Sequence, residues 1–189
     1  MKIFISGGCK NGKSYYAQHL AKHQQNSSGE TLYYIATMNA MDGEDEERIK
    51  RHQGERAGWG FVTVEQGRDI EKILDLCDHS GSFLLDSLTA LLANEMFPGV
   101  EEVDKNASGK IWSGLVKILD KVSDMVIVSD YIYSDAIMYD PLTEEYKKSL
   151  AALDRLAARR CDVVIEVCYS QILIHKGREA FDGAFKKMC

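Results

Sequence analysis

Proline and paired cysteine are scarce in this chain of 189 residues. Only two prolines occur, Pro98 and Pro141, and no linker of biased composition is visible, so the sequence predicts one domain over residues 1–189. The five cysteines are odd in number and include no Cys-x-x-Cys pair, which favours reduced thiols over a disulfide framework or a zinc site. No apolar run approaches the roughly 18 residues of a membrane span, so we expect no such span.

An excess of positive charge is also lacking. The chain has 23 Lys and Arg against 29 Asp and Glu, which gives a net charge of −6. Nucleic-acid binding needs a basic face, so we expect no nucleic-acid partner, although a local basic pocket for nucleotide phosphates remains compatible with this charge. The first residues predict a strand rather than the apolar segment of a signal peptide, which, with reduced thiols, favours a cytoplasmic protein.

Short apolar runs alternate with longer amphipathic stretches. The runs predict strands at Lys2–Ser6, Leu32–Ala36, Phe61–Val64, Ser82–Leu85, Met125–Ser129, Val163–Cys168 and Ile172–His175. The stretches predict helices at Lys13–Gln24, Gly43–Arg56, Asp69–Cys77, Ser87–Met96, Lys105–Lys121 and Thr143–Arg160, with Thr143 capping the last. Nearly continuous apolar strands are typical of parallel sheets covered on both faces. The alternation therefore predicts an α/β fold, a three-layer sandwich around a mostly parallel sheet.

The segment "FISGGCKNGKS" fits the phosphate-loop pattern G-x-x-x-x-G-K-[ST], with Gly7, Gly12, Lys13 and Ser14 at the fixed positions. Such a loop turns its backbone amides toward phosphate oxygens, and the following helix adds its positive end. Lys13, expected to face solvent, would neutralise the β- and γ-phosphates, and the Ser14 hydroxyl would hold Mg²⁺. The sequence thus predicts a nucleotide site in a phosphate-loop NTPase fold of the RecA-like type. Its loop residues are Gly7, Gly8, Cys9, Lys10, Asn11, Gly12, Lys13 and Ser14.

A phosphate loop also needs an acidic partner for the magnesium, at the end of another buried strand. Asp86 follows "SFLL" and Asp130 follows "MVIVS", so both qualify. An aspartate in such a position also serves as a helix cap or a turn residue. Of the two, we favour Asp86 as the acidic residue that binds the metal and takes part in catalysis.

The stretch "EDEERIKRHQGER" is the second unusual feature. On a helix, Arg48, His52 and Arg56 would share one face, because they are spaced four residues apart. Nearby guanidinium groups lower the pKa of a histidine, and a neutral imidazole can attack a nucleotide α-phosphate while the arginines stabilise the developing charge. A solvated charged face is the alternative interpretation of the same pattern.

Several motifs together resemble the bifunctional adenosylcobinamide kinase/adenosylcobinamide-phosphate guanylyltransferases of cobalamin biosynthesis. "ISGGCKNGKS" is similar to the family's opening strand and loop, and "LYYIAT" to its second strand. "RIKRH" followed by "FVTVE" is similar to its R-I-x-x-H element and the aromatic-x-Thr-x-Glu run after it. "LLDSLTALLAN" is similar to a later strand and helix, and the likeness continues from "VIVSD" to "CDVVIEV" over nearly the whole chain.

The resemblance implies that His52 carries GMP covalently, with Lys13 and Asp86 as further catalytic residues. It implies GTP, or ATP for the kinase step, with Mg²⁺ held by Ser14 and Asp86, and a corrinoid as the second substrate. It also implies a homo-oligomer, a trimer in this family. The further nucleotide contacts implied are Ala36, Thr37, Met38, Arg48, Gln53, Gly54, Glu55, Arg56, Glu65 and Asp86.

The chain departs from the family pattern in its C-terminal half. "SDYIYSDAIMYD" stands where the family has Asn-Glu and a glycine-rich loop, with Tyr133, Ser134 and Ala136 in place of flexible glycines. On the following helix, Lys147-Lys148, Ala151 and Asp154-Arg155 replace an Arg-Asp, a glycine and an Asn-Gln pair. Two alternatives therefore stay open: a phosphate-loop kinase for another small metabolite, and a non-catalytic nucleotide-dependent switch.

Overall fold

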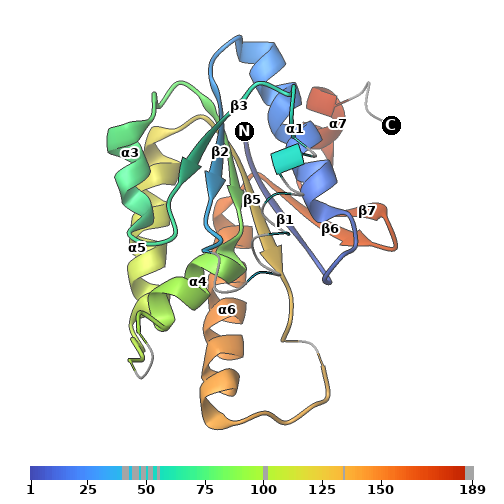
Figure 1. Cartoon of the computed structure of the whole chain (residues 1–189). Helices are drawn as coiled ribbons and strands as arrows, with labels where there is room; N and C mark the ends of the chain where they lie inside the picture. Colours follow the sequence, from blue (N-terminus) through green and yellow to red (C-terminus); the bar gives the residue numbers. More distant parts are fainter. Residues whose placement is uncertain are drawn as a thin grey trace.

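A mostly parallel sheet of seven strands forms the centre of the described chain (Figure 1). The computed structural model describes residues 1–39, 43, 47, 50, 53–54, 56–99, 102–133 and 135–185. The strands are β1 (Lys2–Gly7), β2 (Leu32–Ala36), β3 (Phe61–Glu65), β4 (Ser82–Asp86), β5 (Asp124–Asp130), β6 (Val163–Cys168) and β7 (Gln171–Lys176). They lie in the order β3-β2-β4-β5-β1-β6-β7, and β7 alone is antiparallel to its neighbour. The predicted α/β sandwich is confirmed, and so are all seven predicted strands, to within one residue at each end.

Helices cover both faces of the sheet, as Figure 1 shows. The helical elements are α1 (Lys13–Ser28), the 3₁₀ turn η1 (Ile70–Lys72), α3 (Ile73–Leu76), α4 (Leu88–Met96), α5 (Ala107–Lys121), α6 (Pro141–Arg160) and α7 (Arg178–Phe185). One core packs α1 and α7 against the sheet through residues such as Leu20 and Phe181. The other packs α3, α4, α5 and α6 against the opposite face, through residues such as Leu91, Leu115 and Leu153.

Four predicted helices differ from the structure in their bounds or type, and one of them, α1, continues four residues beyond the predicted Gln24, to Ser28. The predicted helix at Asp69–Cys77 is the 3₁₀ turn η1 followed by the short α3, and α5 begins at Ala107 rather than at Lys105. The last large helix, α6, begins at Pro141, and its N-cap is Asp140, whose carboxylate accepts from the amides of Leu142 and Thr143. The prediction of Thr143 as the cap is therefore wrong, because proline at the first helical position and aspartate before it start the helix two residues earlier.

One helix was not predicted, and one predicted helix falls largely outside the described residues. Helix α7, which was not predicted, buries Phe181 and Phe185 in the core beside α1. The predicted helix at Gly43–Arg56 falls largely outside the described residues, and Arg56 lies in a turn. The described residues within it are helical, namely Gly43, Glu47, Lys50, Gln53 and Gly54.

Two more expectations, on membrane spans and on free thiols, can be compared with the residues that the structure describes. Among the helices described, none is both long enough and apolar enough to cross a bilayer. Cys77 and Cys161 are buried free thiols, and Cys9 and Cys168 are exposed free thiols. Burial raises the pKa of Cys161 to about 12 and also raises that of Cys77, so both stay protonated at neutral pH.

The carboxyl ends of the parallel strands bring the predicted functional residues to one edge of the sheet. Glu65, Ala36 and Asp86 are register partners across β3, β2 and β4. Gly7, the last residue of β1, is the register partner of Asp130 at the end of β5. Ligands of open α/β sheets bind outside this edge, so the topology places both candidate carboxylates where a nucleotide site is expected.

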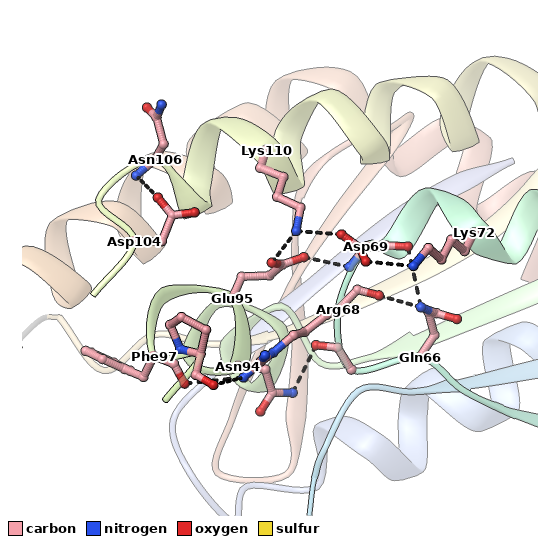
Figure 2. Close-up of polar contacts among 12 residues, drawn as sticks. Gln66, Arg68, Asp69, Lys72, Asn94, Glu95, Phe97, Asp104, Asn106 and Lys110 are labelled. Carbon is pink, nitrogen blue, oxygen red and sulfur yellow. Dashed lines mark hydrogen bonds and ion pairs between the residues drawn. The ribbon is translucent and has the colours of Figure 1, made fainter. Parts of the chain in front are cut away.

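An ion-pair network holds the connection after β3 against α4 and α5 (Figure 2). The buried carboxylate of Glu95 accepts from the backbone amide of Asp69 at 2.6 Å and from Lys110 at 2.6 Å. Lys110 also pairs with Asp69, and its hydrogen bond is the main cause that lowers the pKa of Asp69 to about 2. The side-chain amide of Asn94 donates to the carbonyl oxygens of Thr37 and Gly67 at 2.6 and 3.1 Å. These contacts fix the carboxyl edge of β2 and β3 on the helical layer.

Candidate functional site

The phosphate loop joins β1 to α1 and has the backbone that its sequence predicts. Gly12 has φ +90°, in the left-handed region that favours glycine, and a Cβ at Gly7 would overlap Asn11 and the carbonyl of Val167. The side-chain amide of Asn11 donates to that same carbonyl, which holds the loop on β6. No side chain of the described residues caps the start of α1, and its first turn has no acidic residue. The first amides of α1 are therefore available to an anion.

Lys13 is buried rather than exposed to solvent. Its side chain is 6 % exposed, and its ammonium lies 2.5 Å from the Asp130 carboxylate and donates to the carbonyl of Gly8 at 2.7 Å. The expectation of a solvent-facing lysine is therefore wrong, because the register of β1 with β5 places a carboxylate beside it. The ammonium still lines the cavity above the loop.

Asp86 occupies the end of β4 on the other side of the same cavity. Its carboxylate accepts from the Tyr34 hydroxyl at 2.9 Å. Beside it, the Thr37 hydroxyl accepts from the amide of Ser87 at 2.7 Å and donates to its carbonyl at 2.8 Å. These bonds join the ends of β2 and β4, so the backbone that carries Asp86 is fixed.

One cavity of about 1410 Å³ lies over this edge of the sheet. Many of the sequence-predicted residues line it together: Cys9, Lys10, Asn11, Gly12, Lys13, Ser14, Ala36, Met38, Gln53, Arg56, Glu65 and Asp86. Gly7, Gly8, Thr37 and Gly54 do not line it, and the Thr37 side chain is fully buried against Ser87. Arg48, His52 and Glu55 lie outside the described residues.

The structure adds an aromatic wall at the β2–β3 end of the cavity that the sequence analysis missed. Tyr15 and Trp59 line the cavity, and the His19 ring lies between them at centroid distances of 4.3 and 4.6 Å. Burial lowers the pKa of His19. Arg56 stacks over the Tyr34 ring at 3.9 Å. Because the wall combines α1 with the loop before β3, no local sequence pattern marks it.

The opposite end of the cavity is formed by α4, α6 and the end of β5. Its lining residues are Thr89, Ala90, Ala93, Val128, Asp130, Ile132 and Tyr146. The Tyr146 hydroxyl donates to the carbonyl of Thr89 at 2.8 Å, and burial raises the pKa of this phenol. Tyr146 lies within the predicted helix at Thr143–Arg160, and the helical pattern gives no sign that it also lines the cavity.

A buried acid lies behind that end. Asp154 of α6 is 3 % exposed and accepts from the Tyr133 hydroxyl at 2.9 Å. Burial raises the pKa of Asp154 to about 6, and the charge of Asp130 acts in the same direction. The other carboxylate oxygen of Asp154 has no hydrogen-bond partner among the residues that the structure describes. At mildly acidic pH, this carboxyl group is therefore largely protonated and neutral.

A magnesium ion with a nucleotide is compatible with these residues. The described part of the chain holds no cluster of three or more His, Cys, Asp or Glu side chains suited to a metal. Magnesium in nucleotide sites uses one or two protein oxygens, water and the phosphates, so it needs no such cluster. Ser14 and Asp86 line one cavity and supply a hydroxyl and a carboxylate oxygen of the kind that Mg²⁺ prefers.

A protein-family model described as cobinamide kinase / cobinamide phosphate guanyltransferase matches residues 3–173. The bifunctional adenosylcobalamin biosynthesis protein CobP of Pseudomonas aeruginosa is 29 % identical over 166 residues, which are 87 % of this chain and 91 % of that protein. The proteins of the same description named CobU from Escherichia coli and Salmonella typhimurium are each 31 % identical. Each of these two matches covers 51 % of this chain and 51 % of the relative.

Solved structures of similar fold include an ATPase domain and a KaiC-like protein from Pyrococcus horikoshii. The ATPase domain has a TM-score of 0.53 at 12 % identity, and the match covers 94 % of this chain and 77 % of that domain. The KaiC-like protein has a TM-score of 0.50 at 11 % identity, and the match covers 94 % of this chain and 80 % of that protein. These likenesses confirm the predicted RecA-like phosphate-loop fold.

Proposed function

The chain belongs to the cobinamide kinase / cobinamide phosphate guanyltransferase family of transferases, and we propose that it phosphorylates adenosylcobinamide and then guanylylates the product. The observation that carries this proposal is one cavity in which the phosphate loop, Lys13 and Asp86 meet Gln53 and Arg56. Gln53 directly follows His52 in the sequence. The same cavity thus combines a cradle for phosphates with Gln53, the sequence neighbour of the proposed nucleophile.

The kinase step transfers the γ-phosphoryl group of GTP or ATP to the aminopropanol hydroxyl of adenosylcobinamide. The hydroxyl oxygen forms a bond to the γ-phosphorus, and the bond between that phosphorus and the β–γ bridging oxygen breaks. The loop amides and Lys13 stabilise the charge that develops on the phosphates. Ser14 and Asp86 would hold Mg²⁺, which would supply further neutralisation of phosphate charge.

The guanylyl step uses His52 as the nucleophile. A ring nitrogen attacks the α-phosphorus of GTP, a nitrogen–phosphorus bond forms, and pyrophosphate leaves. A phosphate oxygen of adenosylcobinamide phosphate then attacks the same phosphorus and releases the histidine, which gives adenosylcobinamide-GDP. Arg48 and Arg56 keep the imidazole neutral and stabilise the charge that develops on the phosphate.

The remaining nucleotide contacts follow from the cavity and from the neighbourhood of His52. We infer that the nucleotide touches Cys9, Lys10, Asn11, Gly12, Ala36, Met38, Gln53 and Glu65, which line the cavity, and Glu55, which is close to His52 in the sequence. A homotrimer in the cytoplasm, where GTP is available and thiols stay reduced, completes the proposal. Light scattering of the purified protein tests the trimer by its mass.

A mass spectrum of the protein after incubation with GTP and magnesium tests the guanylyl step. We expect one added GMP, stable to alkali and labile to acid, and located at His52 by fragmentation. His52→Ala should abolish the adduct. His175→Ala is the matched control, since His175 is an exposed histidine on β7 that pairs with Glu166.

Other outcomes point to the alternatives. Phosphorylation of adenosylcobinamide without any protein-bound GMP would leave a kinase and remove the histidine intermediate. Nucleotide binding with no product from either corrinoid substrate would instead favour a nucleotide-dependent switch.

A further inference from the structure

Asp130 is the second aspartate that lines the cavity, and its surroundings differ from those of Asp86. Asp130 is 19 % exposed and pairs with the Lys13 ammonium at 2.5 Å. The carboxylate of Asp86 accepts from the neutral hydroxyl of Tyr34. The partner of Asp130 is therefore the cation that the phosphate loop offers to a nucleotide, whereas the partner of Asp86 is not.

The backbone at Asp130 is held on both sides. Its amide donates to the Thr89 hydroxyl at 2.9 Å, and the amide of Tyr131 donates to the carbonyl of Gly7 at 3.3 Å. Thr89 is itself fixed, because its carbonyl accepts from the Tyr146 hydroxyl. The main chain is thus anchored to α4 and β1, and a change of partner at Asp130 involves the side chain alone.

A bound triphosphate competes for Lys13. Phosphate oxygens attract the loop lysine, and a lysine that turns toward the β- and γ-phosphates leaves the carboxylate of Asp130 without its ion pair. A carboxylate inside a cavity needs a hydrogen-bond donor in exchange. Lys13 would then contact the γ-phosphate. Since the Asp130 carboxylate contacts Lys13 in the structure, this carboxylate lies close to the place of the γ-phosphate, separated from it by about the length of one side chain.

The cavity has room for a second substrate at this position. Its volume of about 1410 Å³ exceeds the roughly 300–1,000 Å³ that is usual for one small ligand. The lining on the Asp130 side of the cavity includes the mostly apolar side chains of Ala90, Ala93, Ile132 and Tyr146. This wall can hold the body of an organic acceptor while the carboxylate takes its hydroxyl group.

We propose that Asp130 is the general base of the kinase step, released from Lys13 when the nucleotide binds. This inference rests on the proposed function and assigns the base within it. The acceptor hydroxyl donates to the Asp130 carboxylate, its oxygen attacks the γ-phosphorus, and its proton passes to Asp130 as the β–γ bond breaks. The leaving nucleotide diphosphate keeps the electron pair. Asp86 has a different part, that of the proposed metal ligand.

Asp130→Asn tests the assignment, because asparagine keeps the shape and the backbone contacts but cannot take the proton. We expect phosphorylation of adenosylcobinamide to fall by about 10²–10⁴-fold in kcat, the usual worth of a general base. GTP affinity should not fall, because Lys13 loses a competing carboxylate, and the transfer of GMP to adenosylcobinamide phosphate should not be slowed. Asp130→Glu should recover part of the kinase rate, since it restores a carboxylate.

Two further variants serve as comparisons for Asp130→Asn, one as a negative control and one at the proposed metal ligand. Asp182→Asn, which changes an exposed aspartate on α7, should leave both reactions unchanged. Asp86→Asn should slow both reactions, since both use the metal-bound nucleotide. Wild-type kinase activity in Asp130→Asn would overturn the proposal, and so would a loss that higher magnesium concentrations restore, which would make Asp130 a metal ligand. If the wild-type protein makes no phosphorylated corrinoid, the kinase half of the proposed function fails as well.

Discussion

The chain builds two parts of the cavity in different ways. We call them the phosphate end, which is formed by the phosphate loop, and the acceptor end, which is formed by α4, α6 and the end of β5. The phosphate end is nearly continuous in sequence, since residues 7–14 supply the loop and Lys13 starts α1. The other end combines α4, the last residues of β5, and Tyr146 of α6, which together span more than fifty residues of sequence. The first can be recognised from spacing alone, whereas the second exists only after the strands have paired.

The two ends also differ in how they hold charge. At the phosphate end, the first turn of α1 has no acidic residue and the loop presents amides toward an anion. At the other end, Asp130 and Asp154 lie close enough for the charge of one to raise the pKa of the other. One end is therefore suited to bind negative charge, and the other to take up protons.

Lys13→Ala should produce the largest effect and remove the link between the two ends. We expect GTP-dependent turnover to fall by at least about 10²-fold, because the loop loses the cation that stabilises the transferred phosphate. GTP affinity, measured by calorimetry, should fall with it. Stability should fall by less than the roughly 3–5 kcal/mol of a fully buried pair, since Asp130 retains access to water.

Lys117→Ala serves as the control for that change. Lys117 is a half-exposed lysine on α5 with a long contact to Glu71 at 3.6 Å. Its removal should leave turnover and GTP affinity unchanged. Unchanged GTP affinity in Lys13→Ala would contradict the assignment of the phosphate loop.

Ala93→Phe should affect the two ends of the cavity differently. The larger side chain would narrow only the acceptor end, where we expect the corrinoid to bind. It would fill part of the cavity that Ile132 and Tyr146 also line, so we expect the KM for adenosylcobinamide to rise by about tenfold or more, about 1.4 kcal/mol of lost binding. The KM for GTP and the yield of protein-bound GMP should not change. Steady-state kinetics with each substrate varied in turn provide the measurement.

Ala180→Phe is the matched substitution away from the cavity. Ala180 is exposed on α7, on the opposite face of the sheet, so corrinoid and GTP kinetics should both stay at the wild-type values. A rise in the KM for GTP in Ala93→Phe would show that the nucleotide, and not the corrinoid, uses this wall.

The sequence predicts the sheet and the phosphate end well for a physical reason. Apolar runs of about five residues are typical of strands buried on both faces, as β1, β2, β4 and β5 are, and the loop pattern fixes its own backbone. The helix α7 was missed because Phe181 and Phe185 are its only large apolar residues and Gly183 weakens its helix propensity. Local periodicity is too weak a signal for so short a helix.

Strand order explains what the sequence could not predict of the site. Both Asp86 and Asp130 end apolar runs, so the pattern alone cannot separate their parts. Only the register of Gly7 with Asp130 shows which carboxylate lies beside Lys13. The buried state of Lys13, and the wall around Ala93, follow from the same pairing. The parts assigned to His52 and its neighbours stay predictions.

Asp154→Asn should have the smallest effect, on stability rather than on binding, and it tests the proton-accepting character of the acceptor end. The pKa of Asp154 is raised from 3.8 to about 6, chiefly by burial. Below pH 3.8 the carboxyl group is protonated in the folded and unfolded states alike. As the pH rises toward 6, the unfolded chain loses the proton first, so the free energy of unfolding of the wild-type protein falls. Above this folded-state pKa the cost of the buried charge reaches about 3 kcal/mol.

Asparagine keeps an acceptor for the Tyr133 hydroxyl and removes the buried charge. Asp154→Asn should therefore match the wild-type stability near about pH 3.5 and exceed it by about 1–3 kcal/mol at about pH 8. Urea denaturation across this pH range measures the difference. Asp120→Asn, which changes an aspartate that is half exposed and pairs with Arg160, should give a curve parallel to the wild type. Parallel curves for Asp154→Asn would instead show that Asp154 ionises as readily in the folded protein as in the unfolded chain, and the acceptor end would then have no buried proton site.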